Sequence, residues 1–518
     1  MGKKSKKKSK TSKKRGPLFE EIASCTPEQV ACWVNVESAP TYRLLRRPVN
    51  LDELNPYGRP LAIWRENETL TYISPRGTDC KPKRRGHSLL LKYFGLGMDI
   101  YIVGNTEDAV AETAALLMSL EEPTEDSMSA ELFIGSGHII PVDFQAAGSQ
   151  CLAHMLDADP DRFVRLFNLK LNVEQSAVLA TASHTIELEL SRCRFEDGGT
   201  TFVDKLEERA SDFGSLFFEE EIFLSDENLK RLLAVDRIGS LFLPLLDNDE
   251  LALAAFSARA KFLDYDISST QLGKATFAFF DVVTTQLSLR IKHDGHTFPT
   301  DVMVPFWRRI AALGHFVHMS IQIELDANAH HVVVPACILQ EILRAVVANR
   351  NLECLALFDR DSQVYLEPHL ATLFDGLKDH QRLRSLRLFV EETESFGPNF
   401  SFLRQFLSHN KHIRVTDEDG NYYTDGKIIE EIYSLNAFYR DSAKLAVQPA
   451  PERPLLVVTA LMRSASKDIK RSALLLTDHV DVLRELVQFA ILGGGESFSL
   501  QALGDDILKR KLNRKTRK

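Results

Sequence analysis

One short pattern recurs about ten times between residues 169 and 413, and it constrains the fold more than any other feature of the chain. The pattern is apolar-x-x-apolar-x-apolar, followed by a turn-like gap and an amphipathic stretch. Its cleanest copies are Leu352-x-x-Leu355-x-Leu357 and Leu383-x-x-Leu386-x-Leu388. Self-similarity at a period of roughly 20–50 residues indicates a solenoid, in which each unit buries its apolar face only by stacking on its neighbours.

The central apolar residue of each copy marks the phase of the repeat, and successive markers lie on average about 27 residues apart. Alternating apolar residues place one face of a short strand in a core, so the interleaved residues face the other way. The markers are Leu169, Leu188, Leu216, Leu241, Leu263, Leu287, Met319, Leu355, Leu386 and Ile413. We predict a partner-binding strand face that includes Glu187, Glu189, Arg290, Lys292, Gln322 and Arg387.

Between the predicted strands lie stretches with apolar residues three and four positions apart, the spacing of an amphipathic helix. Residues 200–211, 337–347 and 369–377 show it most clearly. The sequence therefore predicts an α/β fold that alternates strands with helices. An ordinary parallel α/β domain has the same alternation and stays open as an alternative to a solenoid.

One copy, Thr185-x-x-Leu188-x-Leu190-x-x-Cys193-x-Phe195, follows the leucine-rich-repeat consensus. Residues 160–416 resemble the ribonuclease-inhibitor-like branch of that family, which has one strand and one helix in each unit. The resemblance implies a curved solenoid that binds a protein partner on its strands. Most other copies lack the Asn or Cys that caps buried backbone groups in the family.

The remaining segments divide the chain into five parts. We expect a disordered basic arm at 1–16, a small α/β region at 17–145, the solenoid at 146–416, a hairpin and helical C-terminal cap at 417–495, and a basic tail at 496–518. Within 17–145 the pattern predicts a helix beginning at Thr26, two strands around residues 66–68, a strand at 99–103 and a helix capped by Thr106. Asp419-Gly420 predicts the hairpin turn, and residues 428–443 and 455–492 predict helices.

Positive charge is concentrated at the two ends of the chain. Residues 1–15 hold nine Lys or Arg and residues 509–518 hold seven, without an acid in either, although the whole chain has a net charge of −9. Such runs are typical of nuclear localisation signals and of nucleic-acid-binding arms, and a solvated tail is the third alternative. The basic residues are Lys3, Lys4, Lys6, Lys7, Lys8, Lys10, Lys13, Lys14, Arg15, Lys509, Arg510, Lys511, Arg514, Lys515, Arg517 and Lys518.

The sequence offers little that would carry catalysis or bind a metal. Its seven Cys are scattered, which favours a reducing compartment. His315-x-x-His318 lacks the helical H-E-x-x-H arrangement of a zinc site. Asp417-x-Asp419-x-Asn421 begins like a calcium loop, but Tyr422 stands where that loop needs Gly. We therefore predict no catalytic, cofactor or metal site, and the absence of a long apolar run predicts no membrane span.

These observations favour a non-enzymatic scaffold that binds a protein partner on the strand face. The alternative is a nucleic-acid-associated protein, nuclear or nucleolar, that is anchored to RNA or DNA by its two basic tails. An intracellular location is expected, with the nucleus or nucleolus favoured and the cytoplasm left open. An enzyme with its site in residues 17–145 is a third hypothesis.

Overall fold

The computed structural model describes residues 16–22, 40–54, 58–75, 87–121, 131–136, 141–295, 297–325, 334–357, 367–446, 453–461, 468–477 and 479–492. The predicted helix at Thr26 and both basic tails lie outside these residues. The chain forms two compact units, residues 1–267 with 281–284 (unit 1) and residues 268–280 with 285–518 (unit 2). The fold is mixed α/β, with parallel strands that alternate with helices, as predicted.

Unit 1 begins with strands that are mostly antiparallel. Strand β4 (Thr69–Pro75) pairs with β3 (Leu61–Trp64) and β6 (Met98–Gly104), and β5 (His87–Tyr93) pairs with β6 and β7 (Glu131–Gly135). At the other side of β3 lie β2 (Thr41–Leu44) and β1 (Phe19–Ile22). Helix α2 (Glu107–Met118) packs on these strands, and the Thr106 hydroxyl accepts the Ala109 N–H at its start. The predicted strands and the cap are confirmed.

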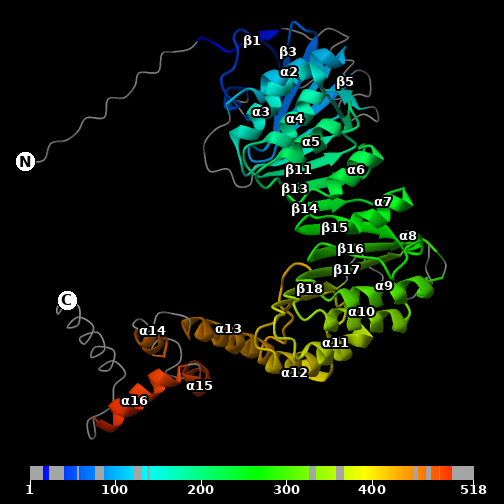
Figure 1. The fold of residues 1–518 in the computed structure, drawn as a ribbon. Helices are drawn as coiled ribbons and strands as arrows, with labels where there is room; N and C mark the ends of the chain where they lie inside the picture. Colours follow the sequence, from blue (N-terminus) through cyan, green and yellow to red (C-terminus); the bar gives the residue numbers. More distant parts are fainter. Residues whose placement is uncertain are drawn as a thin grey trace, which may run out of the picture. The chain divides into compact units, whose positions relative to one another are not determined.

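The rest of unit 1 is a parallel series in chain order. The strands are β7, β9 (Phe163–Phe167), β11 (Ile186–Ser191), β13 (Gly214–Glu219), β14 (Ile238–Leu243) and β15 (Phe262–Ser268). The connecting helices stack beside one another on one side of the strands: α3 (Ser149–Ala158), α4 (Val173–Thr181), α5 (Thr200–Glu208), α6 (Asp226–Leu233) and α7 (Asp249–Ala254) (Figure 1). Because β7 pairs with β9, residues 131–135 belong to the same sheet as the first repeats.

The predicted phase holds within this series but not at its start. Leu188, Leu216, Leu241 and Leu263 are register partners from strand to strand, and all are buried. Leu169 is wrong as a marker, because the partner of Leu188 in β9 is Val164. Leu169 instead lies in β10 (Leu169–Leu171), which pairs in a small separate sheet with β8 (Val142–Asp143) and β12 (Arg194–Phe195).

Unit 2 continues the alternation with its own parallel strands. These are β16 (Gln286–His293), β17 (His318–Leu325), β18 (Cys354–Leu357), β19 (Ser385–Leu388) and β20 (Arg414–Thr416). The helices are α8 (Ser269–Leu272), α9 (Thr300–Leu313), α10 (Ala336–Ala348), α11 (Leu370–Leu377) and α12 (Ser401–His409). Leu287, Met319, Leu355 and Leu386 are in register, whereas Val415 and not Ile413 is the partner of Leu386.

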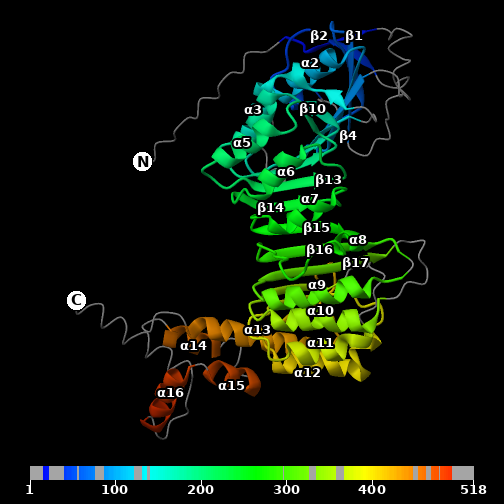
Figure 2. The same ribbon diagram turned by 45° about the vertical axis from the view of Figure 1, so that its right-hand side comes forward.

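The C-terminal segment is helical, as predicted. An Asp417–Asn421 turn brings Thr416 and Tyr422 into an antiparallel bridge, and α13 (Ile428–Ala446) then packs on α12 (Figure 2). Three further helices follow, α14 (Arg453–Ala460), α15 (Ile469–Thr477) and α16 (Val480–Leu492). They share a small core that includes Val457, Val458, Leu475 and Val482.

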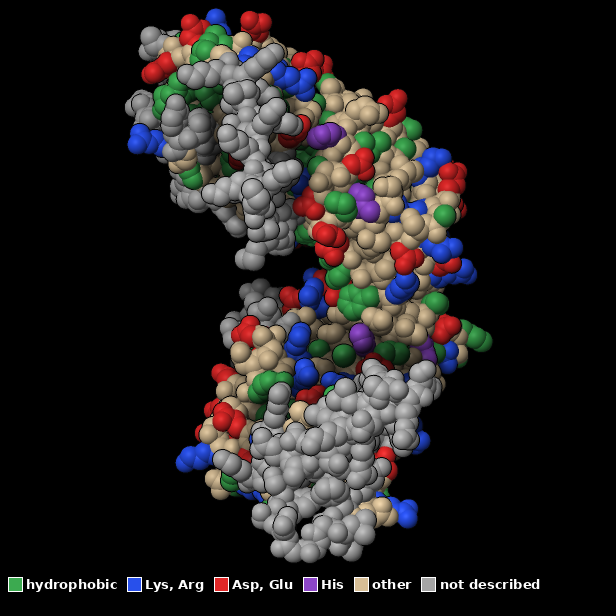
Figure 3. All heavy atoms as spheres, turned by 90° about the vertical axis from the view of Figure 1, so that its left-hand side faces the viewer, with side chains coloured by type: hydrophobic (Ala, Val, Ile, Leu, Met, Phe, Trp, Pro, Cys, Tyr) green, Lys and Arg blue, Asp and Glu red, His purple; other side chains and the backbone are tan. Residues whose placement is uncertain are grey.

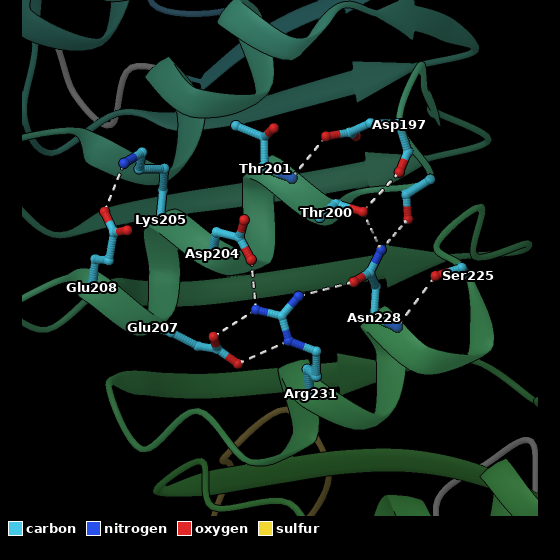
Figure 4. A network of polar contacts seen from close by, with 11 residues as sticks. Asp197, Thr200, Thr201, Asp204, Lys205, Glu207, Glu208, Ser225, Asn228 and Arg231 are labelled. Atoms are coloured by element: carbon cyan, nitrogen blue, oxygen red, sulfur yellow. Dashed lines mark hydrogen bonds and ion pairs between the residues drawn. The ribbon is translucent and has the colours of Figure 1, made fainter.

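Surface ion pairs join adjacent helices of unit 1. The guanidinium of Arg231 on α6 lies 2.6 Å from carboxylate oxygens of both Asp204 and Glu207 on α5 (Figure 4). The Asn228 amide on α6 donates to the Thr200 hydroxyl on α5 and to the Gly198 carbonyl in the turn before α5. All three charged groups are partly exposed, so we expect each ion pair to contribute about 1 kcal/mol or less to stability.

Buried polar side chains link successive helix–strand turns of unit 2. The Asn349 amide donates to the Ala345 carbonyl at 2.6 Å, and its oxygen accepts the Phe316 N–H at 3.2 Å. The Nδ1 atom of His380 accepts the Leu383 N–H, and its Nε2 atom lies 3.0 Å from the Asn349 carbonyl oxygen. These two partners assign the tautomer that carries its proton on Nε2. Asn410 then donates to the His380 carbonyl at 2.8 Å.

We call Asn349, His380 and Asn410 the polar ladder. Each residue stands three positions before the first apolar residue of a repeat, at Leu352, Leu383 and Ile413. The polar ladder hydrogen-bonds to backbone groups just before the strands begin. In the leucine-rich-repeat consensus that the sequence resembles, the Asn instead follows the strand. The sequence analysis did not single out these three residues.

Candidate partner-binding face

The side chains interleaved with the buried leucines of unit 1 form what we call the strand face. Its predicted members Glu187 and Glu189 lie there on β11, the first exposed and the second half-buried. In register with them are Phe163 and Arg165 on β9 and Ser215 and Phe217 on β13. The prediction that these positions face away from the core is confirmed, because the alternate residues Leu188 and Leu190 are buried.

Four phenylalanines form a continuous row on the strand face, which we call the aromatic row: Phe163, Phe217, Phe242 and Phe262. The rings of Phe217 and Phe242 stack at 3.9 Å between centroids with an interplanar angle of 15°. Phe163 meets Phe217 edge-on at 5.3 Å, and Phe262 lies 5.6 Å from Phe242. All four are partly exposed. Contiguous aromatic surface of this kind is typical of interaction sites rather than of ordinary solvated surface.

Beside the aromatic row lies a cluster of three carboxylates, two of which pair with one guanidinium. Arg165 Nε forms ion pairs with Glu131 on β7 at 3.0 Å and with Glu189 on β11 at 3.2 Å. Neither contact has the alignment of a hydrogen bond from Nε. The same guanidinium lies 5.0 Å from the centre of the Phe163 ring. Glu219 on β13 lies close enough to Glu189 to raise the pKa of its carboxyl. This carboxylate cluster therefore contains three acids, of which Glu131 and Glu189 pair with Arg165.

The surroundings of Glu189 shift its pKa. Burial raises the pKa of Glu189 to about 7, and the neighbouring Glu219 and Glu131 add to the rise while Arg165 opposes it. A second cation placed near Glu189 would favour its ionised form. The cluster is thus arranged to accept a positively charged group beside an aromatic surface.

The other predicted residues lie on the corresponding face of unit 2. Arg290 Nε donates to the Gln322 side-chain oxygen at 2.9 Å across β16 and β17, and Lys292 is the register partner of Glu324. Arg387 on β19 is exposed between Ala356 and Thr416. The structure therefore brings together Arg290 and Gln322, and separately Glu187 and Glu189. The predicted basic residues of the two tails lie outside the described residues.

Sequence reasoning missed the aromatic row, Arg165, Glu131 and Glu219. The four phenylalanines belong to the segments FVRLF, SLFFE, SLFL and FLDYD at residues 163–167, 215–219, 240–243 and 262–266, but Phe218 and Tyr265 in the same segments are buried, so aromatic residues alone do not mark the exposed face. On the face that Figure 3 shows, acidic, basic and hydrophobic side chains are interspersed among the described residues.

Within the part of the chain that the structure describes, no group of three or more His, Cys, Asp or Glu is placed to hold a metal ion. His318 lies partly exposed on β17, and the ring of His315 stacks on Phe316 at 4.4 Å. Among the same described residues, the helices are too short or too polar to cross a membrane. Neither the known protein families nor the curated proteins include one that matches this chain.

Proposed function

We propose that this protein is a non-enzymatic scaffold with a leucine-rich-repeat-like solenoid, and that it binds a partner protein on the strand face. The aromatic row is the observation that carries the proposal. Helices occupy one side of the parallel strands, and the other side presents four partly exposed rings at close spacing. Exposed aromatic residues at the centre of a surface are the usual anchors of protein–protein binding.

The contacts of Cys193 support the family resemblance. Its buried thiol lies 3.2 Å from the Leu166 carbonyl of the preceding repeat and also contacts the Ser191 carbonyl. A side chain that satisfies backbone groups between repeats performs the task expected of the consensus Cys. The in-register leucines of β11, β13, β14 and β15 support the same stacked arrangement.

The carboxylate cluster points to the chemistry of the partner. Glu131 and Glu189 pair with Arg165 beside the aromatic row, Glu219 lies close to Glu189, and Glu187 adds a further exposed carboxylate on β11. Charge complementarity therefore favours a partner segment that carries Lys or Arg. Such cations gain from both the carboxylates and the ring faces.

Glu187→Lys in the full chain tests this proposal. The substitution reverses one exposed charge on the strand face, so it leaves the buried leucines unchanged. Its matched control is Glu227→Lys, which makes the same change at an exposed position of α6. We expect quantitative affinity capture, run after nuclease treatment, to lose a defined protein partner with Glu187→Lys and to retain it with Glu227→Lys. Identical capture by the two variants would refute binding on the strand face.

The charge of the tails favours a second candidate function, association with nucleic acid in the nucleus or nucleolus. Residues 1–15 and 509–518 together supply sixteen Lys or Arg. Phosphate binding by such segments depends on charge and weakens with salt. RNA affinity that is strongly salt-dependent and disappears when both tails are deleted would support this function. Unchanged affinity after the double deletion would exclude it.

A further inference from the structure

A basic hollow of about 550 Å³ lies in unit 2 at the end where strands β19 and β20 begin. Its walls come from the turns that precede these strands and from helix α13. They include Lys378, Lys411, His412 and Tyr439. This hollow is separate from the strand face of unit 1, and its walls consist of described residues only.

Three cations surround His412. Burial lowers the pKa of His412, and the positive charges of Arg384, Arg440 and Lys411 lower it further. Burial also lowers the pKa of Arg440, with Arg414 the next contributor. Lys411 lines the hollow, and Arg384 and Arg440 lie close to its His412.

The hydrogen bonds around these cations do not neutralise them. The Arg384 guanidinium donates to the backbone carbonyls of Gln381 and Leu383, and Arg440 donates to the Lys411 carbonyl at 3.0 Å. Carbonyl oxygens carry no net charge, so the positive potential remains. Asp379 is an acid in the wall of the hollow. Asp375 forms an ion pair with Lys378 at 2.7 Å, and Asp441 forms one with Lys444 at 3.2 Å.

An aromatic ring lies among the cations. The Lys411 ammonium is 4.6 Å from the centre of the Tyr439 ring, and the His412 ring meets the same ring at 5.6 Å and 62°. Tyr439 is partly exposed. Positive charge next to an accessible aromatic face is the combination that holds single-stranded nucleic acids, because the cations contact phosphates and the ring stacks on a base.

We propose that this hollow binds a single-stranded nucleic acid, with Lys411 in its wall and the neighbouring Arg384 and Arg440 against phosphates and Tyr439 against a base. The site is built from the folded part of unit 2 and does not depend on the strand face. It is also distinct from the basic tails, so it would add a fixed contact to any binding by them. An acidic peptide would satisfy the cations equally well but would leave the aromatic ring without a stacking partner.

The test uses the full chain with the double substitution Arg384→Gln and Lys411→Gln, and fluorescein-labelled poly(U) as the probe. Its matched control is Lys427→Gln with Lys444→Gln, which removes two exposed charges elsewhere in unit 2. The affinity for poly(U) is measured by anisotropy over a range of salt concentrations. Loss of two phosphate contacts on a single strand lowers the slope of log affinity against log salt by about 1.4. We expect that decrease for the first pair and a smaller one for the control. Equal affinities and slopes would overturn the proposal.

Two further measurements localise the contact. Ultraviolet crosslinking of poly(U) is expected to label the peptide that contains Tyr439, and crosslinks confined to the two tails would overturn the site. Unlabelled polyglutamate serves as a competitor of the same charge without bases. If polyglutamate displaces labelled poly(U) as effectively as unlabelled poly(U) does, the hollow is a site for acidic peptides and the proposal is overturned.

Discussion

Replacement of Asn349 by Ala is expected to destabilise unit 2 by about 2–3 kcal/mol. Asn349 is fully buried, and its side chain joins the end of α10 to the beginning of the preceding strand segment. Alanine leaves the buried Phe316 N–H without its side-chain acceptor, which costs about 1–3 kcal/mol. Loss of the bond to the Ala345 carbonyl adds about 1 kcal/mol, offset in part because the buried amide itself is removed.

Asn351→Ala is the matched control for this substitution. Asn351 is the same residue type two positions later, and it is exposed. Such a surface substitution changes the free energy of unfolding by about 0.5 kcal/mol or less.

The fluorescence of Trp307 reports on unit 2, where this residue is buried. The chain has two other tryptophans, Trp33 and Trp64, so both are replaced by Phe in the background used for all variants. Urea unfolding followed at Trp307 then gives the free energy of unfolding of its surroundings. Equal values for Asn349→Ala and Asn351→Ala would refute the structural role that we assign to the polar ladder.

Three other substitutions test separate features of unit 1 by urea unfolding, and a fourth, at Gly420 in unit 2, serves as the comparison for the last of them. The pKa of Glu189 is raised to about 7 in the folded state, so the unfolded chain loses this proton at lower pH and the wild type loses stability as pH rises from about 4.5 to about 7. Glu189→Gln should lack that loss of stability. Parallel profiles of stability against pH for the two proteins would contradict this expectation. Arg231→Gln should lower the free energy of unfolding by about 1 kcal/mol or less at low salt and by still less near 1 M salt, because the ion pairs that it breaks are partly exposed. A larger decrease that does not depend on salt would contradict the view that these pairs are exposed surface contacts. Gly214→Ala should lower the free energy of unfolding by about 3 kcal/mol, because Gly214 has a φ of +104° and an added Cβ would collide with the Ile186 carbonyl. Gly420→Ala should lower it by only about 1–2 kcal/mol, because Gly420 has a φ of +86° but open space around it. Equal costs for the two substitutions would exclude the collision.

The predicted helices and strands agree with the structure because the apolar periodicity is strong. Residues 200–211, 337–347 and 369–377 correspond to α5, α10 and α11, and the leucine markers from Leu188 to Leu386 lie in strands. The two wrong markers stand at the ends of the series. At Leu169 a second short strand directly follows β9, so the apolar run Leu166 to Leu171 spans two strands instead of one.

The strand face was predicted only in part, because the sequence analysis selected polar residues at the outward positions. Glu187 and Glu189 were found by this criterion. Phenylalanines in the same positions read as core residues, since a single sequence does not say which side of a strand the helices cover. Their exposure follows from the register of β9, β13, β14 and β15, which places Phe163, Phe217, Phe242 and Phe262 opposite the helices.

By itself, the sequence determined the alternation of strands and helices, the phase of the buried leucines and the segregation of charge to the tails. These properties depend on residues that are close in the chain, so a period or a local charge count reveals them. Only the tertiary structure decided which side chains meet across strands and turns. Glu131, Arg165, Glu189 and Glu219 come from four strands, and Arg384, Lys411 and Tyr439 come from two turns and a helix. Their mutual distances depend on strand register and helix packing, which no local pattern encodes.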